Sequence, residues 1–457
     1  MSECNLFDEF PQVSAKQLKQ KIQFDLKGAD YNETLVWESA EGIKVKPFYH
    51  SEDLGGTTSP GRDSKEWFIA QSIFAGDSKK ANAKAKEILG KGVESLIFTI
   101  PNAEINLIDL LQGIDIAKTP IHFHFEFLDL NPIKELVTFL ENKNCQVFFH
   151  VDSIGHLLRK GNWYQSQKED NAKLEELLNL TKPYKTIFPL GIDVSVLQNA
   201  GADLVQQLAY ALAHANEYLN LYKSAFSKPT FTIAVGGNYF FEIAKIKALR
   251  WLWSTLANEY GVNTECHIFA TPSKRNKTLY DYNVNMLRTT SECMSAILGG
   301  ADTVCNLAYD GIYHKDNEFA ERIARNQLVL LKEESYFEEA ANATEGAYYI
   351  ESLTQQLAEK ALILFKQIEA SGGFLDMLYR GKIQQKLRES ALKEQALFDE
   401  GKITLVGTNK YENPKDRMKD DMELYPFLKK RSEKTQIIPI IEKRLAEELE
   451  QKRLDDE

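Results

Sequence analysis

Two neighbouring apolar runs decide the fold, IHFHFEFL at residues 121–128 and QVFFHVD at residues 146–152. Each run has the length of a buried strand, and a helix-length segment separates the two. The same alternation of strand and helix continues from Trp67 to about Phe374. Strands that alternate with helices indicate βαβ units and therefore a parallel sheet. Further strands are predicted at 95–100, 186–193, 231–235, 266–270 and 303–308.

These seven strands, with an eighth and less distinct one near Phe337–Ala341, predict an α/β fold of the (β/α)8 TIM-barrel type. An open doubly wound sheet is the alternative. Neither a GxGxxG pattern nor a Walker loop marks a nucleotide site. The helices predicted between and after the strands are 203–222, one that Asn238 caps, 319–334 and 353–369.

The segments on either side of the predicted barrel, which spans residues 65–375, are expected to be extensions. Residues 1–64 form an arm, in which Ser14 and Gln17 have capping-box spacing ahead of a helix. Two short strands are predicted at 35–37 and 43–49. Residues 376–457 form a charged extension that ends in a helix over 437–454. That last helix is either solvated or packed on a partner, and both interpretations stay open.

The composition excludes some classes of function. A formal net charge of -11 argues against nucleic acid and anionic membranes as partners. The five cysteines include no CxxC pair, which is typical of reduced, buried thiols in a cytoplasmic protein. The N-terminus lacks the apolar segment of a signal peptide, and no apolar run approaches the roughly 20 residues that span a bilayer. We therefore expect a soluble, cytoplasmic protein.

The residues that alternate along the first run carry the most suggestive chemistry. In a strand, His122, His124 and Glu126 share one face, and on the next strand Gln146, Phe148, His150 and Asp152 do the same. Two histidines in an HxH pattern can present imidazoles to a divalent metal. One hypothesis is therefore an independent metallohydrolase that uses His122, His124 and Asp152, with His267 as a further ligand. The other is a polar barrel interior whose groups bond to one another.

Six segments occur in the same order as in a known family. They are FDLKGADY at 24–31, EGIKVKPFY at 41–49, FFEIAKIKALR at 240–250, LRTT at 287–290 with ILGGAD at 297–302, ERIARN at 321–326 and GAYYIE at 346–351. The chain resembles the small subunits of the acyl-CoA mutase family, which includes methylmalonyl-CoA mutase. The resemblance implies a (β/α)8 barrel and a heterodimer in which a large subunit binds adenosylcobalamin. That subunit would interconvert methylmalonyl-CoA and succinyl-CoA.

The departures from the family pattern are equally informative. Catalytic members carry a tyrosine and arginines in a segment that here reads KEWFIAQS, with Ala70 and Ser72 around Gln71. The family's QTSG becomes ATPS at 270–273, and its SLHTNAxDE becomes TVCNLAYDG at 303–311, which loses the histidine. No Asp-x-His, the pattern of the cobalt ligand, occurs in the sequence. The resemblance thus implies a chain without the flavodoxin-like cobalamin-binding domain.

Catalytic members are understood to thread the CoA tail along the barrel axis. The bulky residues predicted to face inward here, His122, His124 and Glu126 on one strand with Phe148 and His150 on the next, would fill that bore. The resemblance therefore implies no catalytic, cofactor-binding or metal-binding residue in this chain, which would act as a non-catalytic subunit of an isomerase complex. A split mutase barrel that works with a separate cobalamin-binding protein is a third hypothesis. Phe7, Phe10, Trp251 and Trp253 are candidates for partner contact, although the two tryptophans are equally compatible with the core.

Overall fold

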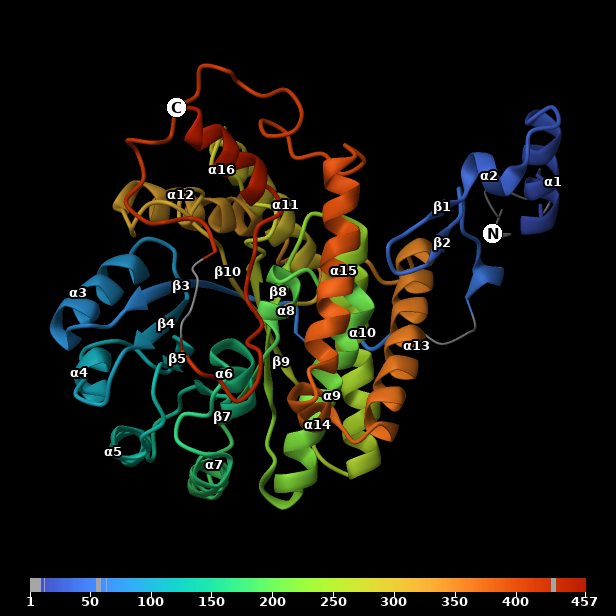
Figure 1. Ribbon diagram of the computed structural model, residues 1–457. Coiled ribbons are helices and arrows are strands. Elements are labelled where there is room, and N and C mark those ends of the chain that lie inside the picture. Colours follow the sequence, from blue (N-terminus) through green and yellow to red (C-terminus); the bar gives the residue numbers. More distant parts are fainter. Residues whose placement is uncertain (1–9, 12, 55–58, 63, 429–432) are drawn as a thin grey trace, which may run out of the picture.

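The computed structural model describes residues 10–11, 13–54, 59–62, 64–428 and 433–457. Eight parallel strands close into a barrel in the order β10-β3-β4-β5-β6-β7-β8-β9, which confirms the predicted fold class. Figure 1 shows the barrel strands side by side in the body of the molecule. The strands are β3 Phe68–Phe74, β4 Ser95–Ile100, β5 Ile121–Phe125, β6 Val147–Val151, β7 Ile187–Asp193, β8 Thr230–Val235, β9 His267–Pro272 and β10 Thr303–Cys305.

The prediction of the eighth strand is wrong. Residues 337–341 form turns, and the eighth strand is β3, which pairs with β4 and β10 and closes the barrel. In its sequence, FIAQSIF, the small and polar residues Ala70, Gln71 and Ser72 interrupt the apolar ones, so a search for apolar runs does not find it. Trp67, which precedes β3, is completely buried.

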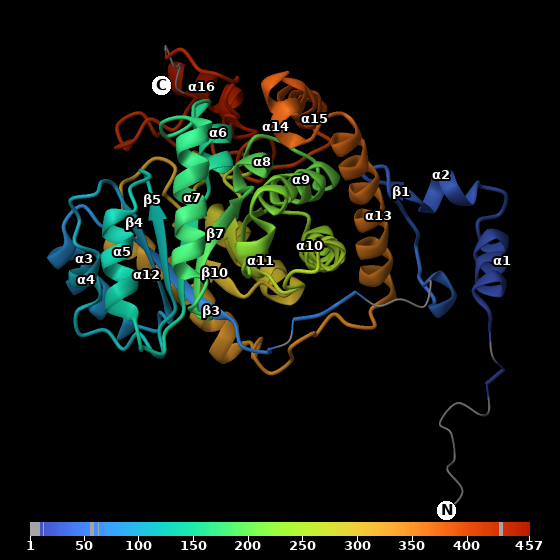
Figure 2. The same cartoon turned by 90° about the horizontal axis from the view of Figure 1, so that it is seen from below.

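Helices surround the strands, as Figure 2 shows in a view turned by a right angle from Figure 1. Asp203 caps α9 through a capping box with Gln206, whereas Asn238 precedes α10 without a side-chain capping bond. A π-helical turn, Leu330–Glu334, extends α12. The helices are α3 Ser78–Leu89, α4 Leu107–Leu111, α5 Asn131–Leu140, α6 Ser153–Lys160, α7 Gln167–Thr181, α8 Ser195–Asn199, α9 Leu204–Tyr222, α10 Tyr239–Tyr260, α11 Val284–Gly299 and α12 Glu318–Val329.

The N-terminal arm projects away from the barrel beside α13 (Figures 1 and 2). It consists of α1 (Ala15–Asp25), α2 (Tyr31–Leu35) and a two-stranded sheet of β1 (Trp37–Glu38) and β2 (Lys44–Val45). The predicted capping box of Ser14 and Gln17 is present. No residue of α1 is buried, and Phe24 is 80% exposed. Of the four aromatic residues proposed for partner contact, Phe7 lies outside the described residues, Phe10 is exposed, Trp251 is half-buried and Trp253 is core.

The C-terminal extension packs back onto the barrel. Helices α13 (Tyr348–Ala370), α14 (Phe374–Tyr379) and α15 (Lys382–Asp399) follow α12, and α13 packs on α9 and α10. The tail, residues 400–457, then crosses the carboxyl end of the barrel. There Ile440 N donates to Leu158 O, Lys443 N to Asn199 O and Leu445 N to Arg275 O. The predicted last helix is shorter than expected, since α16 covers only Glu447–Asp455.

No described helix is both long enough and apolar enough to serve as a membrane-spanning segment.

Candidate functional site: the bore of the barrel

The strand registers place a bulky set of side chains on the inner face of the barrel. His122 on β5 pairs with Ile97 on β4 and with Phe148 on β6, and Phe148 pairs with Phe188 on β7. Paired residues of neighbouring strands point to the same side of a sheet, so these four side chains face inward together. Their sequence neighbours Leu96, Phe98, Phe123 and Phe149 belong instead to the large apolar core beneath the outer helices. The predicted inward position of His122, His124, Phe148 and His150 agrees with this arrangement.

Rings from opposite strands meet in the middle of the bore. In the closed order, β5 and β9 are four strands apart and therefore face each other across the barrel. The ring centroid of His122 on β5 lies 5.3 Å from that of Phe269 and 5.6 Å from that of His267, both on β9. Phe148 stacks on His122 at 4.4 Å and contacts His267 at 4.3 Å. These four side chains, which we call the ring plug, occupy the bore at this level.

Each histidine of the plug is bonded to a side chain outside it. His122 Nδ1 lies 2.8 Å from His150 Nε2, and His267 Nε2 lies 2.9 Å from Thr303 Oγ1 on β10. Burial holds the pKa of His122 and of His150 well below the usual value, and it lowers the pKa of His124 and of His267 to about 4. The loss of hydration on burial outweighs the attraction of Asp193 for a charged His124 and of Asp302 for a charged His267, so these groups are neutral near pH 7.

His150 reaches its place through an unusual backbone. Its φ of 45° is left-handed, and the register between β6 and β7 shifts between Phe148 and Val151. A Cβ on Gly191 of β7 would lie 2.8 Å from the Cα of His150. Glycine at position 191 therefore permits the two backbones to approach closely, which leaves room for His150 to stack on His124 at 4.3 Å.

Asp152 does not join the histidines as a metal ligand, and that part of the metallohydrolase hypothesis is wrong. β6 ends at Val151, and Asp152 is the N-cap of α6, so it no longer follows the alternation of the strand. Its Oδ1 accepts bonds from Gly155 N, His214 Nε2 and Tyr218 Oη, and its Oδ2 accepts one from Asp193 N. Burial alone would raise the pKa of Asp152, but His214 and the donated bonds bring it below its usual value.

Glu126 also departs from the expectation, because it lies beyond the end of β5 and is exposed. A cavity of about 50 Å³ remains above the plug and is lined in part by His124, His150, Asp152 and Asp193, with Arg159 bonded to Asp193 at 2.8 Å. Among the residues that the structure describes, no three histidine, cysteine or carboxylate side chains are arranged to hold a metal ion.

Gln71 stands where the catalytic segment of the family was expected. Its side chain points away from the bore and bonds two residues of α12: its Oε1 accepts from Arg325, and its Nε2 donates to Glu321. Its neighbour Ala70 belongs to a small inner cluster with Ile97 and Phe269. This segment therefore places the small residue Ala70 inside the barrel and bonds the outer helix α12 through Gln71.

The geometry can be set beside known proteins. A family model described as methylmalonyl-CoA mutase matches residues 107–455. The methylmalonyl-CoA mutase small subunit of Porphyromonas gingivalis is 34% identical, over 89% of this chain and 71% of that protein. The chain belongs to the methylmalonyl-CoA mutase family. The small subunit of Streptomyces virginiae is 26% identical over 89% of this chain and 72% of that protein. The Porphyromonas gingivalis large subunit is 33% identical over 50% of this chain and 33% of that protein.

The predicted resemblance to small subunits of this family, which is a family of isomerases, is thereby confirmed. The sequence segments on which the resemblance rests make structural contacts. Glu242, in the 240–250 segment, accepts bonds from Gly236 N and Gln198. Lys247 of the same segment forms a buried ion pair of 2.6 Å with Glu351 of the 346–351 segment. Two of the motifs that identify the mutase family are thus in direct contact.

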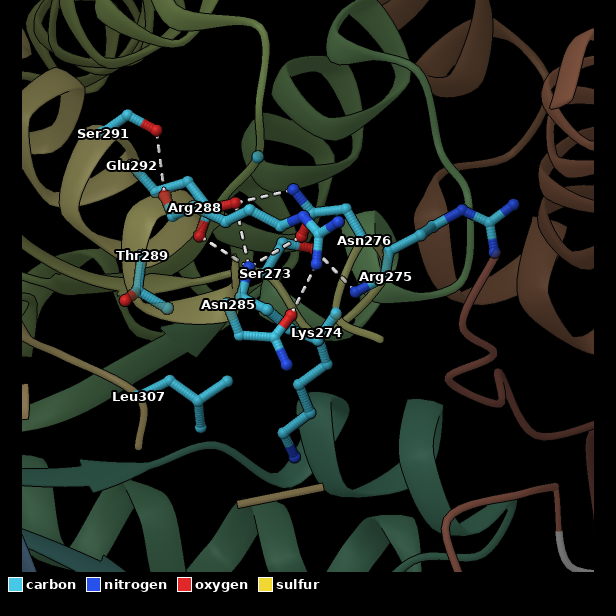
Figure 3. A network of polar contacts seen from close by, with 12 residues as sticks. Ser273, Lys274, Arg275, Asn276, Asn285, Arg288, Thr289, Ser291, Glu292 and Leu307 are labelled. Carbon is cyan, nitrogen blue, oxygen red and sulfur yellow. Dashed lines mark hydrogen bonds and ion pairs between the residues drawn. The ribbon is translucent and has the colours of Figure 1, made fainter. Parts of the chain in front are cut away.

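The LRTT segment also has a structural role (Figure 3). Arg288 Nη1 donates to Thr278 Oγ1 and to Asn285 Oδ1, each at 2.8 Å. One helical turn on, the completely buried Glu292 accepts from Asn276 and forms an ion pair of 2.7 Å with Lys277. These contacts tie α11 to the loop that follows β9, at the carboxyl end of the barrel. A barrel can keep them whether or not its bore is open.

The described residues do not fit the cobalt of a cobalamin. All eight histidines lie in the described part of the chain, and none follows an aspartate by two positions. His122, His124, His150 and His267 are in the bore; His214 and His314 bond to Asp152 and Asp310, His156 stacks on Tyr164 at 3.6 Å, and His50 lies in the arm. No step of a reaction is therefore assigned to a cobalamin on these residues.

Sequence reasoning missed Phe269, although its position two residues after His267 on one strand already places both on the same face.

Proposed function

We propose that this chain is the small, non-catalytic subunit of a heterodimeric methylmalonyl-CoA mutase. A large subunit would bind adenosylcobalamin and carry out the interconversion of methylmalonyl-CoA and succinyl-CoA. The observation that carries the proposal is the ring plug. A CoA tail laid along the barrel axis needs a continuous bore, whereas here the rings of His122 and Phe269 approach to 5.3 Å from opposite strands.

The missing chemistry supports the same conclusion. Ala70 and Ser72 stand where catalytic members carry an arginine and a tyrosine, and none of the eight histidines has the cobalt-ligand pattern. Small and large subunits are both named among the relatives, and Porphyromonas gingivalis has one of each. These observations weigh against the split-mutase alternative, which needs a competent barrel in this chain.

The arm supports a subunit partner. An isolated helix of 11 residues is marginal in water, and α1 buries none of its residues on this chain. Leu18 and Ile22 lie one turn apart on one face of α1, and Leu18 is 41% exposed. The arm therefore presents an unpaired apolar stripe, which a large subunit would cover in the complex.

The test is co-expression with a large subunit of a methylmalonyl-CoA mutase. We expect a 1:1 complex by size-exclusion chromatography and light scattering. We also expect corrin absorbance in the large subunit when it is reconstituted alone, and no corrin absorbance in this chain alone. Mutase turnover or stoichiometric corrin binding by this chain alone would overturn the proposal. Failure to form a complex with any large subunit would overturn the assignment of a partner.

A further inference from the structure

A second cavity lies where the tail crosses the carboxyl end of the barrel. It measures about 520 Å³ and lies between the tail and residues of α6, α8 and the loops after β9 and β10. Pockets for small organic ligands commonly measure about 300–1,000 Å³. The ring plug is not part of this lining, and Arg159 is the one described residue that it shares with the lining of the small cavity above the plug.

One wall of the cavity is apolar and incompletely covered. It includes Tyr425, Leu428 and Ile441 of the tail, which are 55%, 44% and 37% exposed. Ile440 of the tail and Val196 of α8 are buried beside them. Large apolar side chains gathered around a concave site mark a surface that a ligand or partner covers.

The remaining wall carries more cations than carboxylates: the carboxylates are Glu442 and Glu447, and Glu447 accepts from Arg444 N and Leu428 N. Of its cations, Arg159 is bonded to Asp193, Lys443 to Glu448 and Arg444 to Glu450. Two lysines differ from these. Among the described residues, Lys160 at the end of α6 takes part in no ion pair, and the pair of Lys274 with Glu442 is long, at 3.5 Å.

Lys274 is therefore available to a ligand. Its side chain and that of Glu442 are 50% and 39% exposed, and exposed pairs of this kind contribute about 0–1 kcal/mol. In Figure 3, Lys274 extends away from the Glu292 network, while the nearby Asn276 points into it. An incoming anion could replace Glu442 at little cost.

We propose that this cavity binds an amphipathic organic anion, a carboxylate or phosphate monoester on an apolar body. Lys160 and Lys274 would hold the anionic head, and Tyr425, Leu428 and Ile441 would cover the apolar body. Only two available cations face the cavity, so a head with one or two negative charges fits better than a polyanion.

The test is isothermal titration of the full chain with decyl phosphate and with decanoate below their micelle concentrations. We expect one site per chain, with decanol and inorganic phosphate each binding much more weakly, since each lacks half of the recognised chemistry. The two anions distinguish a phosphate head from a carboxylate head. Equal binding of decanol would overturn the role of the lysines, and equal binding of inorganic phosphate would overturn the role of the apolar wall.

Variants make the assignment specific. Lys160→Gln with Lys274→Gln should weaken binding about tenfold, whereas the control pair Lys118→Gln with Lys366→Gln, both exposed elsewhere, should not change it. Ile441→Asp, at a partly exposed position, should weaken binding without unfolding the chain, which circular dichroism checks. Unchanged affinity in both cavity variants, with the chain folded, would overturn the proposal.

Discussion

At the scale of single residues, Asp152 shows how one carboxylate serves structure where the sequence pattern favoured chemistry. Four donors from α6, α9 and β7 converge on its two oxygens, and its side chain is 3% exposed. A buried carboxylate with this many donors is costly to alter, because each donor is left without its partner. Asp152 therefore locks α6 and α9 onto the end of β6.

Asp152→Asn should lower the free energy of unfolding by about 3 kcal/mol. The new amide NH2 group would face hydrogen-bond donors only, so it would leave at least one of them without an acceptor. Urea denaturation followed by circular dichroism measures the change. Asp129→Asn, whose carboxylate accepts a single exposed backbone bond, is the matched control and should cost less than about 1 kcal/mol. Similar losses in the two variants would contradict the role given to Asp152.

The buried histidines predict a dependence of stability on pH. Burial lowers the pKa of His267 to about 4, whereas in the unfolded chain it is near 6.5. As the pH falls from 6.5 to 4, the unfolded chain binds a proton at His267 and the folded chain does not. The free energy of unfolding therefore falls across this window. His267→Gln should reduce the change of the free energy of unfolding with pH by up to about 1.4 kcal/mol per pH unit, which is the contribution of one proton. An unchanged slope in denaturation series between pH 6.5 and 4 would show that His267 titrates normally in the folded chain.

At the scale of elements, the long helix α10 joins much of the molecule through one face. Lys247 reaches Glu351 on α13, and Arg250 donates to Cys266 O, to Gly300 O and to Asp302. The guanidinium thus ties α10 to the starts of β9 and β10. These polar contacts with α13 and with the starts of two strands fix the position of α10 on the barrel.

Arg250→Lys should destabilise the fold by about 2 kcal/mol, because an ammonium group cannot reproduce the planar fork that reaches three acceptors. Thermal unfolding measures the loss. Arg388→Lys on the exposed side of α15 is the control and should leave the melting temperature nearly unchanged. A fall as small as that of the control would mean that the ammonium satisfies the same acceptors.

At the scale of the whole molecule, a filled barrel and an outstretched arm divide the tasks. The barrel encloses the ring plug, while the arm extends beyond it (Figure 2). The apolar stripe of α1 includes Leu18, which is 41% exposed. This division is compatible with the proposed role as a subunit. It also separates two kinds of experiment, since the arm can be altered without disturbing the core.

Leu18→Glu combined with Ile22→Glu should weaken the complex with the large subunit by at least about tenfold, because a charged stripe cannot be buried in the interface. Gln20→Glu, on the opposite face of α1, adds a charge without touching the stripe and should leave the affinity unchanged. Surface plasmon resonance measures both. If the two variants bind alike, the arm lies outside the interface.

Much of the barrel was predictable because its causes are local. The strands at 95–100, 121–128 and 186–193 are apolar runs of strand length, and the structure has β4, β5 and β7 within those bounds. The capping boxes of Ser14 and Asp203 likewise depend on residues three positions apart. β3 was missed because its partners β4 and β10 stabilise a strand that carries glutamine, serine and alanine.

The sequence alone determined the family, the alternation of strand and helix, and the inward face of His122, His124 and Phe148, since each depends on spacing along the chain. Only the tertiary structure decided that His122 contacts Phe269 across the bore, that Asp152 accepts hydrogen bonds from α9, and that the tail lines a second cavity. Those contacts join residues from 62 to 282 positions apart. Closure of the barrel brings such residues together, and no periodicity in the chain encodes which rings meet at its centre.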